Sequence, residues 1–137
     1  MKTNPNAEKI MSERFGHDNV IALATTENGV PYVRYVNAYY EDGSFYTITY
    51  ALSNKMKQIE IDPVVAIAGE WFTAHGKGVS MGWVGKPENR EITGKLKAVF
   101  SEWIDDGDVD PCDENTVILR VDLTDGVLLS HGTRYEI

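Results

Sequence analysis

The fold of this chain is decided by the stretch Val20–Tyr50, which reads VIALATTENGVPYVRYVNAYYEDGSFYTITY. Three runs rich in β-branched, aromatic and other apolar residues are separated by Asn28-Gly29 and Asp42-Gly43. Both dipeptides are strong signals for a tight turn between antiparallel strands. The stretch therefore predicts an antiparallel meander with strands over residues 20–26, 32–40 and 45–50.

The flanking sequence adds helices and further strands. Asn4-Pro5 is typical of a helix start, because a capping side chain precedes proline at the first helical position, and Gly16 ends this helix. Ser53 is expected to cap a short helix that Pro63 stops. A fourth strand is expected over Val64–Phe72, then a glycine-rich loop, then a fifth strand over Val79–Val84.

The last third of the chain predicts one helix and one hairpin. Pro87–Trp103 carries apolar residues at helical spacing and is expected to be the longest helix. An acidic loop over residues 105–114 follows, and the hairpin is expected around Asp125-Gly126. The count is about seven strands and three helices without a linker or repeat. Residues 1–137 are therefore expected to form one mainly β (α+β) domain, a small antiparallel barrel or sandwich with helices outside.

Charge and cysteine content restrict the partners and the compartment. The net charge of the 137 residues is −8, and nine acids against one base lie between Glu102 and Asp125. Because no basic stripe is present, we expect neither nucleic acid nor an anionic membrane as a partner. Cys112 is the one cysteine, and no apolar run has transmembrane or signal-peptide length, which favours a cytoplasmic protein.

Two motifs imitate known sites without completing them. Asp106, Asp108 and Asp110 alternate as in a calcium loop, but Pro111 and Val117 replace its required glycine and bidentate glutamate, so a solvated acidic loop is favoured. The glycines at 76, 78 and 82 have the spacing Gly-x-Gly-x-x-x-Gly, which is one residue longer than the dinucleotide fingerprint. We therefore expect them to serve tight turns and close backbone approach.

The segment Gly78-Val79-Ser80-Met81-Gly82 matches the nucleophile elbow of hydrolases, and His131 follows in the order of a triad. The elbow requires a strand, a turn and then a helix, whereas Ser80 is expected inside a strand. We therefore expect Ser80 not to be a nucleophile. His75 and His131 have no second metal ligand at useful spacing, so no metal site is expected.

A phosphate site is the strongest constellation. Arg34 lies on the second predicted strand, Thr47 and Thr49 lie on the third, and Ser53-Asn54-Lys55 opens the short helix. The free N–H groups and partial positive charge of a helix N-terminus favour an anion, and the two cations add to this. A capping serine beside solvated charges is the alternative, and spacing alone does not separate the two.

At these residues the chain resembles the pyridoxamine 5′-phosphate oxidase superfamily of FMN-binding split barrels, in its general-stress-protein-like branch. The resemblance covers residues 21–81. It rests on the segments Arg34-Tyr35-Val36-Asn37, the strand ending in Thr49, Ser53-Asn54-Lys55, Gln58-Ile59 and Asp62-Pro63-Val64-Val65-Ala66. No counterpart of the oxidase's C-terminal substrate segment is present.

The resemblance implies a six- to seven-stranded antiparallel split β-barrel that forms a homodimer, with FMN at the subunit interface. Arg34 and Lys55 would hold the FMN phosphate, and Ser53 and Asn54 would assist. The flavin would be lined by Tyr35, Val36, Asn37, Ile48 and Thr49, and Lys77 would stand where the family places a polar flavin contact, usually glutamine.

The implied function is that of an FMN-dependent oxidoreductase whose substrate and catalytic residues the sequence does not identify. Two alternatives remain open at this point. One is a flavin-binding or stress-related protein without enzymatic activity. The other is the same barrel with deazaflavin F420 or haem as its cofactor.

Overall fold

A computed structural model describes residues 4–137 of the chain. Its helices are α1 (Pro5–Phe15), α2 (Asn54–Ile61) and α3 (Arg90–Val99), with a short 3-10 helix, η1 (Pro87–Asn89). Its strands are β1 (Asn19–Glu27), β2 (Val30–Glu41), β3 (Ser44–Tyr50), β4 (Val64–Gly69), β5 (Phe72–Trp83), β6 (Thr116–Ser130) and β7 (Thr133–Glu136). The predicted meander of β1, β2 and β3 is confirmed, with turns at Asn28-Gly29 and Asp42-Gly43.

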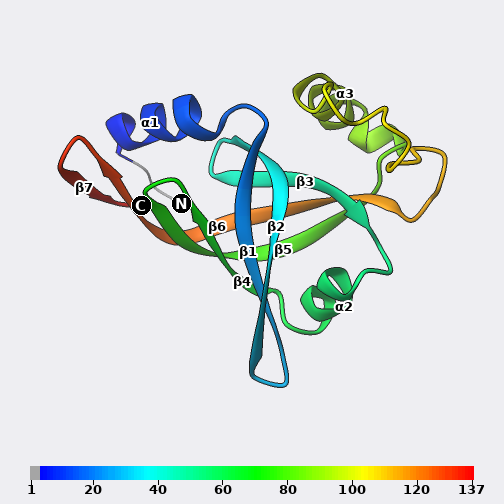
Figure 1. Ribbon diagram of the computed structural model, residues 1–137, viewed down its shortest axis with the longest axis horizontal. Helices are drawn as coiled ribbons and strands as arrows, with labels where there is room; N and C mark the ends of the chain where they lie inside the picture. Colours follow the sequence, from blue (N-terminus) through cyan, green and yellow to red (C-terminus); the bar gives the residue numbers. More distant parts are fainter. Residues whose placement is uncertain (1–3) are drawn as a thin grey trace.

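The sheet closes on itself. Its strand order is β3-β2-β1-β4-β5-β6-β7, all neighbouring pairs are antiparallel, and β3 also pairs with β6. Six strands thus form a closed antiparallel barrel, and β7 extends β6 as a seventh strand (Figure 1). The predicted barrel with flanking helices is confirmed.

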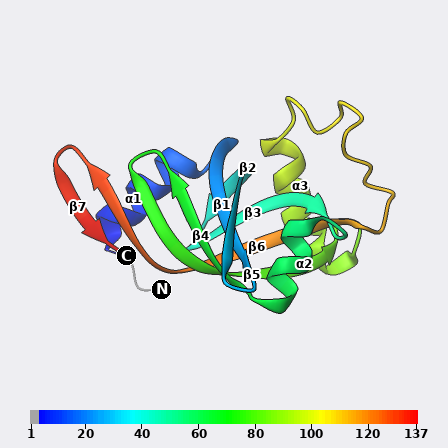
Figure 2. The ribbon, with the colours of Figure 1, turned by 60° about the horizontal axis from the view of Figure 1, so that its bottom comes forward.

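Each helix covers a different part of the barrel. Figures 1 and 2 show α1 and α3 near opposite ends of the molecule, and α2 beside the projecting β1–β2 hairpin. Residues Ala7, Met11 and Phe15 of α1 are buried in the main core, where the rings of Phe15 and Phe45 lie 5.6 Å apart. A second apolar cluster joins α3 to the outside of the barrel. No helix within residues 4–137 is long and apolar enough to cross a membrane.

The structure corrects the boundary between the fourth and fifth strands. The turn lies at Glu70-Trp71, and the glycine-rich segment is part of β5 rather than a loop. A side chain at position 76 would meet the backbone oxygen of Asp122 at 2.8 Å, and one at position 78 would meet Ile59 of α2 at 2.8 Å. These glycines therefore permit close approach of neighbouring segments within a continuous strand. Of the two roles expected for them, close backbone approach applies and a tight turn does not.

Two predictions for the last third are wrong. Asp125-Gly126 is not a turn, because β6 runs through it and the register beside His75 shows a bulge; the last hairpin turns at His131-Gly132 instead. The helix predicted over Pro87–Trp103 consists of η1 and α3 followed by turns, and α1 is longer than α3.

Candidate anion site

The site lies where two neighbouring strands diverge. β2 pairs with β1 over residues 30–38 but with β3 only over residues 39–41. β3 pairs with β6 over residues 44–50. Within the described residues, the early part of β2 and the late part of β3 therefore each have one edge without a partner strand. Arg34 on β2, Thr49 on β3 and Lys55 in the first turn of α2 gather at these edges.

The Arg34 side chain turns toward the barrel interior. Its Nη1 donates hydrogen bonds to the backbone oxygen of Leu23 at 3.1 Å and to Thr25 Oγ1 at 2.8 Å. Its Nη2 donates to Gln58 Oε1 at 3.2 Å. Burial lowers the pKa of Arg34, but a guanidinium remains charged at neutral pH. The group is thus a fixed, half-buried positive charge.

Lys55 brings a second positive charge to the same place. Its Nζ donates a hydrogen bond to Thr49 Oγ1. Burial, and then the nearby charge of Arg34, lower the pKa of Lys55 to about 8. We refer to Arg34 and Lys55 together as the cation pair. Within the described residues, neither side chain of the cation pair forms an ion pair with a carboxylate.

Two half-buried cations without a carboxylate cost free energy through desolvation and mutual repulsion. A bound anion would offset both costs. Lys55 lies in the first turn of α2, so the partial positive charge at the N-terminus of this helix adds to the positive potential of the site. Ser53 caps this helix and accepts a hydrogen bond from the Met56 N–H at 3.4 Å. The chemistry of the site therefore fits a phosphate group.

The remaining predicted flavin-lining residues lie on different faces of β2 and β3. Tyr35 is 80% exposed, whereas Val36 packs against the main core. The amide nitrogen of Asn37 donates to Asp18 at 3.0 Å, so this side chain also has a structural role. Ile48 packs in the second apolar cluster with α3. The side chains of Asn37 and Ile48 thus already have partners within the chain.

Asn54 is exposed at the first position of α2, close to the cation pair. Lys77 is exposed on β5, three strands from β2 in either direction around the barrel. The structure therefore brings Arg34, Thr49, Ser53, Asn54 and Lys55 together, and it does not bring Lys77 to them within one chain.

Sequence reasoning missed a role for Thr25 and Gln58, which hold Arg34 in place. Thr25 follows Ile21 and Leu23 at alternate positions of β1, so its burial could be predicted from strand periodicity. Gln58 lies on the buried face of α2 beside Ile59. A polar residue at a position that the periodicity predicts to be buried was the available sign of a role for Thr25 and Gln58. The spacing of the residues did not identify Arg34 as their partner.

The other motifs do not form a competing centre. Ser80 lies in β5, and its hydroxyl accepts a hydrogen bond from the Gly82 N–H at 3.2 Å, with neither His131 nor an aspartate bonded to it. His75 Nδ1 lies 3.0 Å from Asp125 Oδ1 on the surface. In residues 4–137, no three His, Cys, Asp or Glu side chains gather as metal ligands would.

Comparison with known proteins gives one family match. The family model described as pyridoxamine 5′-phosphate oxidase matches residues 7–128. No curated protein matches the chain.

Solved structures share the fold. A FAD-binding protein from Mesorhizobium loti has a TM-score of 0.70 at 16% identity, covering 99% of this chain and 97% of the other. General Stress Protein 26 from Bacillus anthracis has a TM-score of 0.69 at 18% identity, covering 88% and 92%. An FMN-binding protein related to pyridoxamine 5′-phosphate oxidase, from Nostoc punctiforme, has a TM-score of 0.61 at 18% identity, covering 96% and 87%.

The same fold also carries a different cofactor class. The haem storage protein HutZ from Vibrio cholerae has a TM-score of 0.65 at 16% identity, covering 90% of this chain and 92% of that one. At these identities, the likeness to solved structures shows the fold alone.

Proposed function

The chain belongs to the pyridoxamine 5′-phosphate oxidase family, and from this premise we propose that it binds FMN through the cation pair and acts as a flavin-dependent oxidoreductase. The observation that carries the proposal is the presence of two half-buried cations that lack a carboxylate partner among the described residues. The family and the FAD- and FMN-binding structural neighbours support a flavin as the ligand.

The residues of this chain would bind and orient the cofactor. Arg34 and Lys55 would donate to the phosphate, and the first turn of α2 would add backbone N–H donors. The free edge of β2 at Tyr35, Val36 and Asn37 would offer backbone donors and acceptors to the flavin ring, with Ile48 and Thr49 across the opening. The flavin supplies the redox chemistry when bound.

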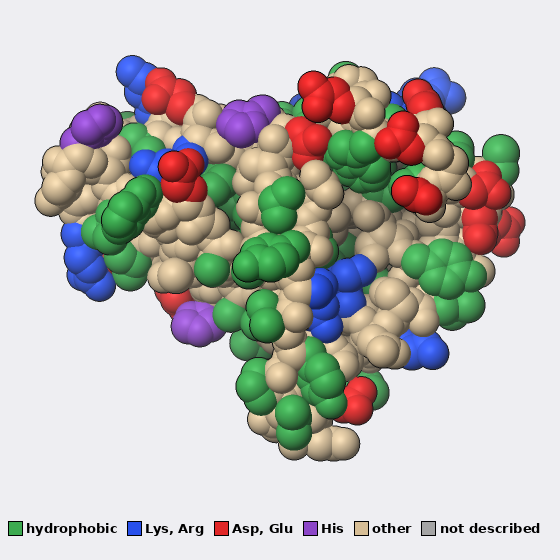
Figure 3. Space-filling model, viewed as in Figure 1, with side chains coloured by type: hydrophobic (Ala, Val, Ile, Leu, Met, Phe, Trp, Pro, Cys, Tyr) green, Lys and Arg blue, Asp and Glu red, His purple; other side chains and the backbone are tan. Residues whose placement is uncertain are grey.

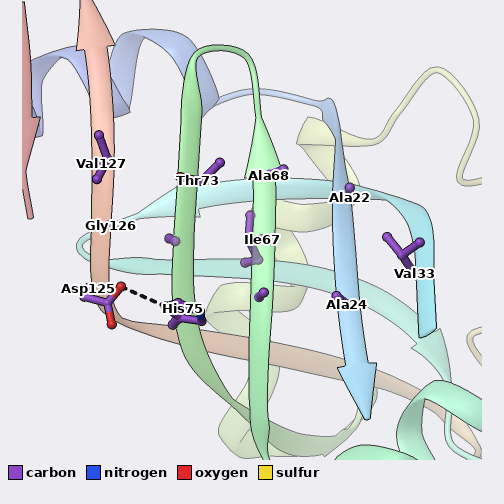
Figure 4. Close-up of a pocket in the computed structure, with 12 residues that line it drawn as sticks. Ala22, Ala24, Val33, Ile67, Ala68, Thr73, His75, Asp125, Gly126 and Val127 are labelled. Atoms are coloured by element: carbon purple, nitrogen blue, oxygen red, sulfur yellow. Dashed lines mark hydrogen bonds and ion pairs between the residues drawn. The ribbon is translucent and has the colours of Figure 1, made fainter. Parts of the chain in front are cut away.

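We also propose a homodimer with FMN at its interface, because one face of the barrel remains apolar and open. Val33 and Tyr35 are 71% and 80% exposed. Beside Val33 lies a hollow of about 370 Å³ over β1 and β4, whose floor is formed by small side chains: Ala22, Ala24, Ala66 and Ala68 (Figure 4). Figure 3 shows hydrophobic side chains gathered on the projecting β1–β2 hairpin. His75 and Asp125 form the polar border of this hollow, and exposed apolar surface with a polar border is typical of an interaction site.

The aromatic residues on the three meander strands support the proposed dimer, because the barrel does not bury all of them. Of the aromatic residues in the meander, Tyr40 and Phe45 are buried in the core, and Tyr39 and Tyr46 pack toward α3. Tyr32, Tyr35 and Tyr50 are left exposed. Lys77 lies on the opposite side of the barrel from β2, so its predicted flavin contact would have to come from the partner subunit.

Light scattering tests the dimer. We expect twice the chain mass at micromolar concentration, and a charged substitution, Val33→Asp, is expected to shift the protein toward the monomer. Trp71→Asp is the control, because Trp71 is similarly exposed but lies at the β4–β5 turn and does not line the hollow. A monomer for the wild-type protein would contradict the proposed dimer.

The absorption spectrum of the freshly purified protein, recorded before and after adding FMN, tests the cofactor. We expect flavin bands that are perturbed on binding and that bleach when NADH or NADPH is supplied without oxygen. Bound flavin that neither nucleotide reduces would favour a flavin-binding protein without this activity. A haem or F420 spectrum in the purified protein would overturn the assignment to FMN.

A further inference from the structure

A chain of polar groups crosses the otherwise apolar end of the barrel beneath Arg34. Thr25 is 0% exposed and Gln58 is 4% exposed, and both are surrounded by core residues of β1 and α2. Thr25 Oγ1 lies 2.5 Å from Gln58 Oε1, and Arg34 bonds to both of these oxygens. Polar side chains at such depth are costly unless they satisfy one another.

The direction of each hydrogen bond in this chain is fixed by chemistry. A guanidinium only donates, so Thr25 Oγ1 must accept from Arg34 and must direct its own proton elsewhere. That proton goes to Gln58 Oε1, which also accepts from Arg34. Because the Gln58 atom accepts twice, it must be the amide oxygen rather than the nitrogen. Arg34 therefore donates to Thr25, Thr25 donates to Gln58, and Arg34 also donates directly to Gln58.

These contacts decide which edge of Arg34 remains available. Three of its five N–H donors are used: two on Nη1, toward Leu23 and Thr25, and one on Nη2, toward Gln58. The Nε–H and the second Nη2–H have no acceptor in the part of the chain that the structure describes. The Nε–Nη2 edge is therefore left as a fork of two donors, a geometry that matches two oxygens of a phosphate.

We propose that Thr25 and Gln58 are positioning residues, which hold Arg34 so that its Nε–Nη2 edge faces the phosphate of the bound ligand. This inference rests on the proposed function. An arginine without these acceptors would sample many rotamers and would have to be ordered at the moment of binding. A side chain ordered beforehand removes that entropy cost, so the ligand binds more tightly without touching Thr25 or Gln58.

The test uses substitutions that keep shape and remove one contact. Thr25→Val keeps the branched side chain but lacks the hydroxyl, and Thr25→Ser restores it. We expect Thr25→Val to weaken FMN binding by about three- to tenfold, as the loss of one or two hydrogen bonds implies, with Thr25→Ser close to wild type. Riboflavin lacks the phosphate, so its affinity is expected to be the same in all three proteins.

Gln58→Met is the second variant, in case Thr25→Val does not fold. It keeps the length of the side chain and removes the amide oxygen, and we expect a similar loss for FMN and none for riboflavin. Equal losses for FMN and riboflavin in either variant would mean that the residue supports the fold rather than Arg34, and would overturn the proposal.

An Arg34→Ala background separates positioning from direct action. If Thr25 acts through Arg34, Thr25→Val should have no further effect on FMN affinity once Arg34 is absent. A full additional three- to tenfold loss in the double variant would overturn the proposal. A loss that disappears in the Arg34→Ala background supports it.

A ligand-free readout keeps this test separate from the proposed function. In the 15N NMR spectrum, the two Nη nitrogens of Arg34 should be resolved in the wild-type protein and in Thr25→Ser, because the hydrogen bonds slow rotation of the guanidinium. They should average in Thr25→Val. Averaged Nη signals in the wild-type protein would overturn the positioning role, whereas wild-type protein that holds Arg34 but binds no FMN would overturn the proposed function alone.

Discussion

Two sets of cations in this small chain have opposite surroundings. On the side of the barrel that α3 covers, Lys95 Nζ lies 2.8 Å from Glu41 Oε1, and Arg120 holds Asp122 through two hydrogen bonds of 2.8 and 3.1 Å. Among residues 4–137, the cation pair of Arg34 and Lys55 has only neutral acceptors. The first set completes its charge balance within the chain, and we propose that a ligand completes that of the second.

The two lysines show the physical consequence of this difference. The hydrogen bond to Glu41 raises the pKa of Lys95. Burial and the Arg34 charge lower the pKa of Lys55 to about 8. The same residue type thus serves as a stable tether for α3 in one place and as a strained, unneutralised charge in the other. A buried cation that has no carboxylate partner is therefore a sign of a binding site for an anion.

The largest effect on FMN affinity is expected when the cation pair is given a carboxylate partner, as Lys95 and Arg120 already have. Thr49→Asp places a carboxylate beside Lys55, where the Thr49 hydroxyl now accepts the Nζ–H bond. The carboxylate would neutralise Lys55 and repel a phosphate, at a cost of several kcal/mol. We expect FMN affinity to fall by at least about 100-fold, measured by calorimetry, with no loss of thermal stability.

Thr49→Asn is the control for this conversion, because it has nearly the same shape without the charge. FMN affinity in Thr49→Asn should remain within a few-fold of wild type. If Thr49→Asp binds FMN as the wild type does, the phosphate is not held by the cation pair.

A smaller effect is expected from pH. Because the folded-state pKa of Lys55 is lowered to about 8, the ligand-free protein loses this positive charge as pH rises through 8, whereas the phosphate requires it. FMN affinity should therefore fall by about tenfold between pH 7 and pH 9, as one pKa unit of lost protonation implies. Fluorescence titration of FMN across this range measures the fall.

Lys55→Arg should remove this alkaline limb, because arginine stays charged throughout the range. The stability of the ligand-free protein should change in the opposite sense. The unfolded chain keeps the Lys55 proton up to its ordinary pKa of 10.5, so this group makes the folded state more stable as pH rises from about 8 to 10.5. An FMN affinity that is flat to pH 9 in wild type would contradict the charged role of Lys55.

The smallest effect is expected on the neutralised side. Arg120→Met breaks a partly exposed ion pair, for which a loss of about 0.2–1 kcal/mol of unfolding free energy is typical, and Lys95→Met releases the tether of α3 to Glu41. Thermal unfolding should register a small decrease in both variants. FMN affinity should not change, and a tenfold loss in either would remove the distinction between the two sets.

How much the sequence predicts depends on where the partners of each residue lie. The Asn28-Gly29 and Asp42-Gly43 turns and the Ser53 cap were predictable, because turn and cap signals are local. The Glu70-Trp71 turn carries no such signal, although Trp71 adopts a φ of 52°, so the fourth and fifth strands were divided wrongly. Gly76 suggested a loop because the close approach of β6 is set only by the folded barrel.

The candidate site follows the same rule. Arg34 and Lys55 could be proposed together, because the meander and the short helix between them are local in sequence. The bonds that hold Arg34 join it to Thr25 and Gln58. These partners are close in sequence too, but which buried polar side chains meet depends on how β1, β2 and α2 pack together. Within residues 4–137 the cation pair forms no ion pair with a carboxylate, and this too could not be predicted, because it depends on every element that packs around the two side chains.

The central claim is that the cation pair holds a phosphate, and one titration tests it most directly. FMN and riboflavin are titrated in parallel into the wild-type protein and into Lys55→Ala and Arg34→Ala. Each substitution should weaken FMN by roughly 10- to 100-fold, since a hydrogen bond to a charged group contributes about 1.5–3 kcal/mol, and riboflavin should barely respond. Equal losses for both ligands, or no loss for FMN, would contradict the account.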